Sequence, residues 1–142
     1  FNENLASFIG HEGAKYFLKS KLGPQDTLYL NYIQEMKDER LLTDFVVMKS
    51  NQLDSLYQTF EPQTKTAYKE EIKAEFMVNF LIEFNKLPIQ QVDKYLPKIE
   101  KLNNTYFQSF RRYNSNMEYF ENEFKRFDDL PSYMEYIKNT YD

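Results

Sequence analysis

The sequence predicts an all-α protein, a helical bundle of about five to six helices. Apolar residues recur at steps of three and four along most of the chain, which is the spacing of one helical face. No stretch alternates apolar and polar residues between turn residues, as a half-buried strand would. With 142 residues the chain has the length of one domain, so we expect residues 1–142 to form a single all-helical domain.

The first two helices are separated by a strong breaking signal. A first helix is predicted over residues 2–21 and ends at Leu22-Gly23-Pro24, where Gly supplies a left-handed cap and Pro prevents continuation. A second helix is predicted from about residue 25 to residue 60, before Pro62. It is long and strongly charged on one side, so a solvated face is expected.

A third helix is predicted to reach Phe84, with Thr64 or Thr66 as its cap. It carries a stripe of large apolar residues at steps of four, which could form a ligand pocket, a dimer seam or a core face. We favour the core, because such a stripe makes one continuous buried face. The stripe consists of Tyr68, Ile72, Phe76, Phe80 and Phe84.

Proline and turn residues divide the last third of the chain. A short helical piece over residues 89–96 should be cut by Pro97. Further helices are predicted over residues 98–113 and 117–127, and after the turn at residues 128–131 to about residue 140.

Composition excludes several classes of site. The formal net charge of -4 gives no basic field that would attract phosphate backbones, so we expect no nucleic-acid partner. The chain has no Cys and a single His, which excludes disulfides, thiolate metal sites and sites that need two histidines. No apolar segment is long enough to cross a bilayer.

The first predicted helix has two unlike faces. On a helical wheel, Glu3 heads a face of small residues, which would let another helix backbone approach closely. That face holds Ala6, Ser7, Gly10, Gly13 and Ala14, and the opposite face, predicted to be core, holds Leu5, Phe8, Ile9 and Tyr16. Glu3 is therefore either a first-turn acid favoured by the helix dipole or a metal ligand presented to a partner helix.

The His11-Glu12 pair is half of a zinc-protease signature and lacks the other half. An HExxH signature needs a second His one helical turn further on. Lys15 occupies that position, and a protonated Lys cannot bind zinc. Glu12 also lies about half a turn around the helix from Glu3, so the two carboxylates do not converge. We predict no metal site at His11, which is expected to be a surface or partner-contact residue.

The opening segment FNENLASFIGHEGA resembles the FNE-x-x-A-[ST]-F-[VI]-x-x-E-G motif of the bacterial predicted aminopeptidases, a family of zinc metallopeptidases of the gluzincin type. The sequence LNNTY at residues 102–106, with Tyr113, is similar to the L-N-N-A-x-L segment of that family and its following Tyr. Residues 120–133 are similar to the family's closing pattern. Two departures are Thr105, where the family usually has Ala, and Asp128-Asp129, in place of a Gly-Asp turn.

In that family an HExxH helix lies upstream, and the Glu of the Asn-Glu pair is the third zinc ligand. The resemblance therefore implies zinc in the parent protein, with Glu3 as a metal ligand and Ser7, one turn further on, as a hydrogen-bond partner that supports it. The HExxH segment does not occur in these 142 residues. On this resemblance the chain is the C-terminal helical fragment of a longer bacterial peptidase, with residues 1–21 as the third-ligand helix. It should be inactive alone and bind no zinc by itself.

The later motif supplies candidate substrate contacts. Asn103 and Asn104 could bind the substrate backbone or amino terminus, and Tyr106 or Tyr113 could stabilise an oxyanion as a phenol donor. Alternatively the Asn pair caps or bends a helix, and the two Tyr side chains pack with exposed hydroxyls. For each residue taken singly, the second interpretation is favoured.

The resemblance also implies partners and a location. The partners would be an N-terminal catalytic half that carries the HExxH helix, and a peptide substrate, and apolar surface around the small face could cause self-association. An amino-terminal export or membrane signal is common in the family and would place the protein at the cell envelope. The competing class is a non-catalytic all-helical binding or scaffold module in which Glu3 has no catalytic role. An HExxH sequence shortly before Phe1 would favour the peptidase.

Overall fold

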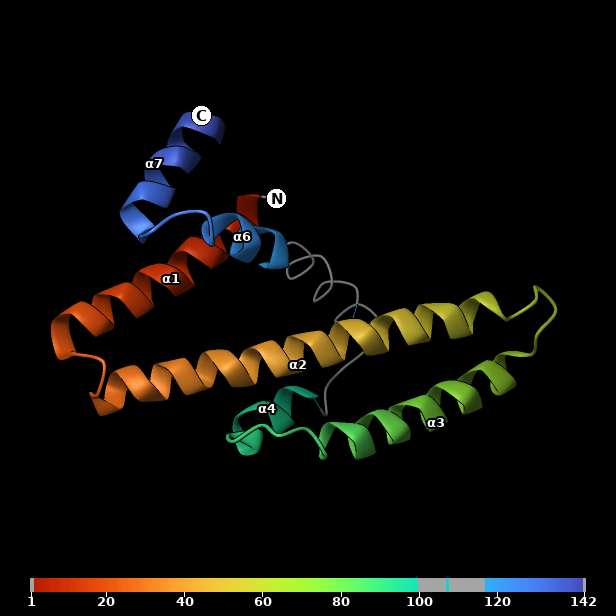
Figure 1. The fold of residues 1–142 in the computed structure, drawn as a ribbon. Coiled ribbons are helices and arrows are strands. Elements are labelled where there is room, and N and C mark those ends of the chain that lie inside the picture. The colour runs from red at the N-terminus through yellow and green to blue at the C-terminus, as the bar shows by residue number, and fades with distance from the viewer. Residues whose placement is uncertain (1, 100–106, 108–116, 142) are drawn as a thin grey trace. The chain divides into compact units, whose positions relative to one another are not determined.

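The computed structural model describes residues 2–99, 107 and 117–141, and this part of the chain is all-helical, as predicted (Figure 1). Its helices are α1 (Asn2–Leu22), α2 (Thr27–Gln58), α3 (Thr66–Phe84), α4 (Val92–Ile99), α6 (Met117–Phe124) and α7 (Leu130–Tyr141). The chain divides into two compact units, unit 1 with residues 1–34 and 112–142 and unit 2 with residues 35–111. A single domain over residues 1–142 stays a prediction.

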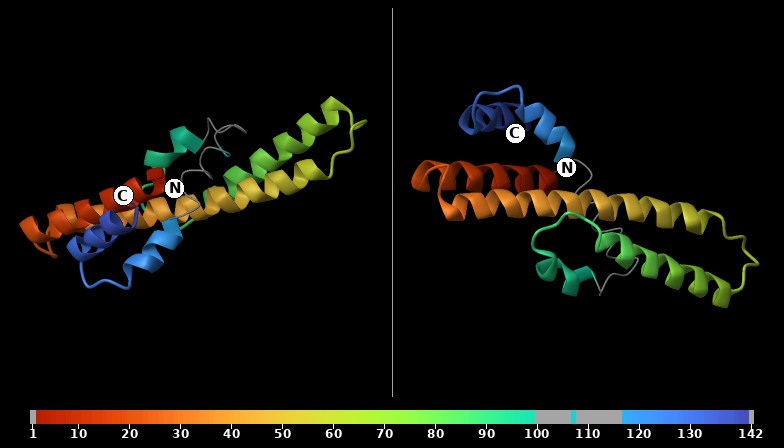
Figure 2. Two further views of the ribbon diagram at one scale, coloured as in Figure 1. Left: turned by 90° about the horizontal axis from the view of Figure 1, so that it is seen from above. Right: turned by 60° about the horizontal axis from the view of Figure 1, so that its bottom comes forward.

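The turn between α1 and α2 forms as the sequence predicts. Gly23 adopts a φ of 91°, and its N–H donates to the Lys19 carbonyl oxygen at 3.0 Å, which closes the end of α1. Three residues later, an Asp26 carboxylate oxygen accepts the Leu28 N–H at 2.8 Å and caps α2. This turn brings the start of α2 back alongside α1 (Figure 2).

Unit 1 has an aromatic core that fixes α1 against α6 and α7. Phe8 is 2% exposed, and its ring centroid lies 6.1 Å from that of Phe120, 5.8 Å from that of Phe124 and 5.8 Å from that of Tyr133. Leu130 closes the same core. Phe8 confirms that the large face of α1 is the core face, but Tyr16, predicted to lie in the core, is 54% exposed. The core face therefore covers only the N-terminal half of α1.

Unit 2 contains α3, α4 and the part of α2 from Glu35 onward, around a separate core. Phe80 and Phe84 are fully buried, and the Phe80 ring centroid lies 4.9 Å from that of Phe45 and 5.5 Å from that of Phe107. The stripe on α3 is thus a core face at its C-terminal end. Tyr68, at its start, is 52% exposed and contacts the Phe60 ring, so the prediction that it is buried is wrong.

Two buried charges in unit 2 are matched by partners far away in the sequence. Asp38 on α2 is fully buried, and its Oδ2 accepts the N–H groups of Gln90 at 3.1 Å and Gln91 at 3.0 Å. Both N–H groups belong to the turn immediately before α4, so a side chain from another helix holds the backbone that leads into α4. Nζ of Lys49 lies 2.6 Å from Oε1 of Glu83, and the same ammonium group lies over the Phe45 ring.

Two predicted details of the later helices are wrong. The N-cap residue of α3 is Lys65, with no side-chain cap hydrogen bond, so neither Thr64 nor Thr66 caps the helix. Pro97 lies inside α4 and does not cut it. A Pro inside a helix removes one N–H donor and lowers helix stability, but it does not by itself end the helix. Most of the predicted helix over residues 98–113, and the turn after it, lie outside the described residues. No helix in the described part of the chain is long and apolar enough to span a membrane.

Candidate functional site

Glu3 lies in the first turn of α1 on an exposed face. Within the described residues its carboxylate has no hydrogen bond or ion pair, so its oxygen atoms are available to a ligand. Ala6, Ser7 and Gly10 follow it on the same side of the helix and are also exposed. A Cβ atom added at Gly10 would meet no atom within 4 Å. The small face of α1 is therefore open at its N-terminal end.

The small face is partly closed further along α1. A Cβ atom added at Gly13 would lie 3.9 Å from a methyl carbon of Leu130, at the start of α7. On the N-terminal side of Gly13, a groove of about 660 Å³ lies between α1 and α7. Ala6 and Gly10 line one wall, and Met134 and Tyr141 line the other. The open part of the small face thus continues into an apolar groove within unit 1.

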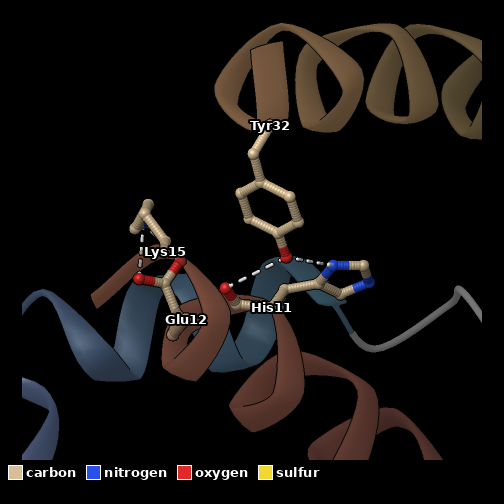
Figure 3. Close-up of polar contacts among 4 residues, drawn as sticks. All are labelled: His11, Glu12, Lys15 and Tyr32. Atoms are coloured by element: carbon tan, nitrogen blue, oxygen red, sulfur yellow. Dashed lines mark hydrogen bonds and ion pairs between the residues drawn. The ribbon is translucent and has the colours of Figure 1, made fainter. Parts of the chain in front are cut away.

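His11 contacts Tyr32 of α2 (Figure 3), and its interpretation as a surface or partner-contact residue stays a prediction. The Tyr32 hydroxyl donates to the His11 carbonyl oxygen at 3.3 Å, and it lies 3.4 Å from Nδ1 of His11. Eight residues of helix separate Glu3 from His11, which is roughly 12 Å along the axis. The two side chains cannot bind the same ion from these positions.

Glu12 is also engaged by its own helix. Its carboxylate oxygens lie 2.5 and 2.6 Å from Nζ of Lys15, as Figure 3 shows. No three His, Cys, Asp or Glu side chains come together as a metal site in residues 2–99, 107 and 117–141. Of the two carboxylates on α1, only that of Glu3 is therefore open to a metal, and a metal there needs ligands from elsewhere.

The predicted substrate contacts are in a segment outside the described residues. These residues are Asn103, Asn104, Tyr106 and Tyr113. Ser7 is exposed one turn after Glu3, and its role as a supporting hydrogen-bond partner stays a prediction.

A buried carboxylate joins α6 to α7, and sequence reasoning missed it. Glu123 is 7% exposed and accepts three phenol O–H groups, from Tyr133 at 2.9 Å, Tyr136 at 3.1 Å and Tyr119 at 3.2 Å. The Tyr119 hydroxyl in turn lies 3.4 Å from that of Tyr141. These bonds compensate the loss of hydration on burial. The Glu at this position looks like an ordinary surface acid, so only the abundance of Tyr nearby in the sequence signals the network.

The phenol network makes unit 1 sensitive to alkali. Burial, with the hydrogen bond to Glu123, raises the pKa of Tyr133 above its usual 10.0, and the hydrogen bond with Tyr119 raises the pKa of Tyr141 to about 12. The folded state therefore keeps protons that the unfolded state loses near pH 10. We expect the free energy of unfolding to be insensitive to these groups below pH 10 and to fall as the pH rises from 10 toward 12.

Urea unfolding at a series of pH values, followed by circular dichroism, measures this loss. Tyr133→Phe should flatten the decline above pH 10, because the substituted ring has no proton to lose. Tyr16→Phe, at an exposed position on α1, is the matched control and should leave the decline as it is. An unchanged decline in Tyr133→Phe would show that this phenol does not contribute.

Comparison with known proteins agrees with the resemblance seen in the sequence. A family model described as "Putative aminopeptidase" matches residues 1–142. No curated protein and no solved structure matches the chain. Since the family match extends over every residue, the chain belongs to this aminopeptidase family.

Proposed function

We propose that this chain supplies Glu3 as the third zinc ligand of a gluzincin-type aminopeptidase and that it works with an HExxH helix from another segment of the same protein. Membership of the aminopeptidase family supports a peptidase function. The observation that carries the proposal is the exposed carboxylate of Glu3 at the head of the small-residue face.

The open space at Gly10 suits a second helix. Small side chains allow two helix backbones to approach closely. The Gly residues of α1 reduce its helix propensity. No atom lies close enough to Gly10 to require a residue without a side chain there. A histidine helix packed on Ala6 and Gly10 would lie one to two turns from Glu3. If Glu3 is a metal ligand beside a partner helix, the small face has a function as the contact surface for that helix. If Glu3 is only a first-turn acid, the small residues have no such function.

The chain's own contribution would be one ligand on a rigid support. Glu3 would provide a carboxylate oxygen, and zinc when bound would lower the pKa of its water ligand and polarise the peptide carbonyl. Ser7, one helical turn further on, could hold the carboxylate by a hydrogen bond. The packing of Phe8 on α6 and α7 fixes the helix that carries both side chains.

The test uses the full-length protein with Glu3→Gln, and Glu12→Gln as the matched control on the opposite side of the same helix. Losing a zinc ligand should weaken zinc affinity and lower the kcat/KM for an aminoacyl anilide by at least about 100-fold, more than a supporting residue would. Glu12→Gln should keep both. Zinc content by mass spectrometry and initial rates provide the two readouts.

Two outcomes would contradict the proposal. Equal zinc content in Glu3→Gln and the unsubstituted protein would remove Glu3 from the ligand set. A full-length protein with no HExxH sequence would instead favour a non-catalytic helical binding module.

A further inference from the structure

Unit 1 contains a second cavity, on the side of α1 opposite to Glu3. Its volume is about 560 Å³, and it lies between the C-terminal half of α1, the start of α2 and the connection from α6 to α7. Phe124 and Leu130 form an apolar part of its wall, and Tyr16 and Tyr29 also line it. The cavity has the size of a small organic ligand.

Most charged groups of this cavity already have partners. Lys15 is neutralised by Glu12, at 2.5 Å. Asp129 accepts the Ser132 N–H at 2.9 Å and caps α7, and hydrogen bonding to the Ser132 side chain and to this N–H lowers the pKa of the Asp129 carboxyl group. These groups contribute little net attraction to a ligand.

Two opposite charges remain. Lys19 lines the cavity from α1, and Asp128 lines it from the connection between α6 and α7. Neither forms an ion pair within the described residues, and they do not pair with each other. The cavity therefore offers one cation and one anion on different walls, with aromatic and apolar surface between them.

One cation, one anion and an aromatic wall favour some classes of ligand over others. A divalent cation is disfavoured, because Glu12 and Asp129 are engaged and the described residues hold no cluster of three ligating side chains. A phosphate-like dianion would meet one unpaired cation beside the carboxylates of Asp128 and Asp129, which repel it. A purely apolar molecule would leave Lys19 and Asp128 unmatched. A zwitterion with an apolar body satisfies both charges and the aromatic wall.

We propose that this cavity binds a free amino acid or short peptide, with the ligand's carboxylate at Lys19, its ammonium group at Asp128 and its side chain against Tyr16 and Tyr29. Such molecules are the products of an aminopeptidase, so the source of the ligand rests on the proposed function, whereas the binding itself does not. Since both charges are exposed, the affinity should be weak, with a Kd on the order of 1 mM.

The test is a titration of the isotopically labelled 142-residue chain with alanylphenylalanine, followed by nuclear magnetic resonance at low ionic strength. Amide signals of residues 15–20 and 124–130 should shift and saturate. The same dipeptide with an acetylated amino end and an amidated carboxyl end should bind at least about fivefold more weakly. Lys19→Gln and Asp128→Asn should each weaken binding about two- to fivefold.

Lys21→Gln is the matched control, because it removes a neighbouring charge of α1 that does not line the cavity. It should leave the Kd unchanged. Equal binding of the blocked dipeptide, an equal loss in Lys21→Gln, or no saturable shift would each overturn the proposal. No metal or catalysis is involved, so a negative result here leaves the role of Glu3 untouched, and the reverse also holds.

Discussion

Phe8→Ala is expected to lower the free energy of unfolding of unit 1 by about 3–5 kcal/mol. Phe8 is 2% exposed and contacts rings from both α6 and α7, so its removal leaves a cavity where three helices meet. The substitution also removes the favourable packing of the Phe8 ring against its aromatic neighbours, which adds to the cost of the cavity. Because α1 carries Glu3, the same substitution should also loosen the proposed ligand helix.

Urea unfolding followed by near-ultraviolet circular dichroism would measure this effect. Phe17→Ala is the matched control, since Phe17 is on the same helix and 58% exposed. It should change the free energy of unfolding by less than about 0.5 kcal/mol. Similar losses of stability in the two variants would show that the packing of Phe8 does not hold α1 in place.

Phe80→Ala is expected to cost unit 2 a similar amount, about 3–5 kcal/mol. Phe80 is fully buried and lies against Phe45 and Phe107, so the residual cavity would open in the centre of this core. Ile82→Ala, at a position on α3 that is 49% exposed, is the control and should have a much smaller effect. The same urea titration gives both values, and a loss under about 1 kcal/mol in Phe80→Ala would contradict a well-packed core.

The two core substitutions together test the prediction of a single domain. Hydrogen exchange in Phe8→Ala should accelerate in α6 and α7, and in Phe80→Ala it should accelerate in α3. If each variant changes protection only in its own unit, the chain has two cooperative units, and the single-domain prediction is wrong. If both variants change protection throughout the chain, it unfolds as one domain.

The sequence predicted the class of fold and the best-marked helix boundaries. Gly23 followed by Pro24 ends a helix, because Gly adopts the left-handed cap and Pro cannot continue the helix. The end of α1 was therefore predicted to within one residue. The errors lie where tertiary contacts decide. Tyr68 has helical core spacing but lies where α3 extends past the core. Pro97 lies inside α4, and the turn before this helix is held by a distant side chain, that of Asp38.

The candidate site was predictable only where a local pattern carries it. Glu3 and the small face are visible on a helical wheel, and the structure places them on an exposed face of α1. Glu123 could not be predicted, since the phenols that bond it come from α7 as well as from its own helix. Lys19 and Asp128 are likewise ordinary surface residues in the sequence, and only the fold places them around one cavity.

The contact between Asp38 and the turn before α4 has a consequence for the order of folding. The acceptor and its donors are 52 and 53 residues apart, so the chain must close a long loop before the turn that leads into α4 is held in place. An eight-residue helix that contains Pro is too short to persist alone in water. The segment should therefore become helical only after α2 has formed, which makes α4 a late element on the folding pathway.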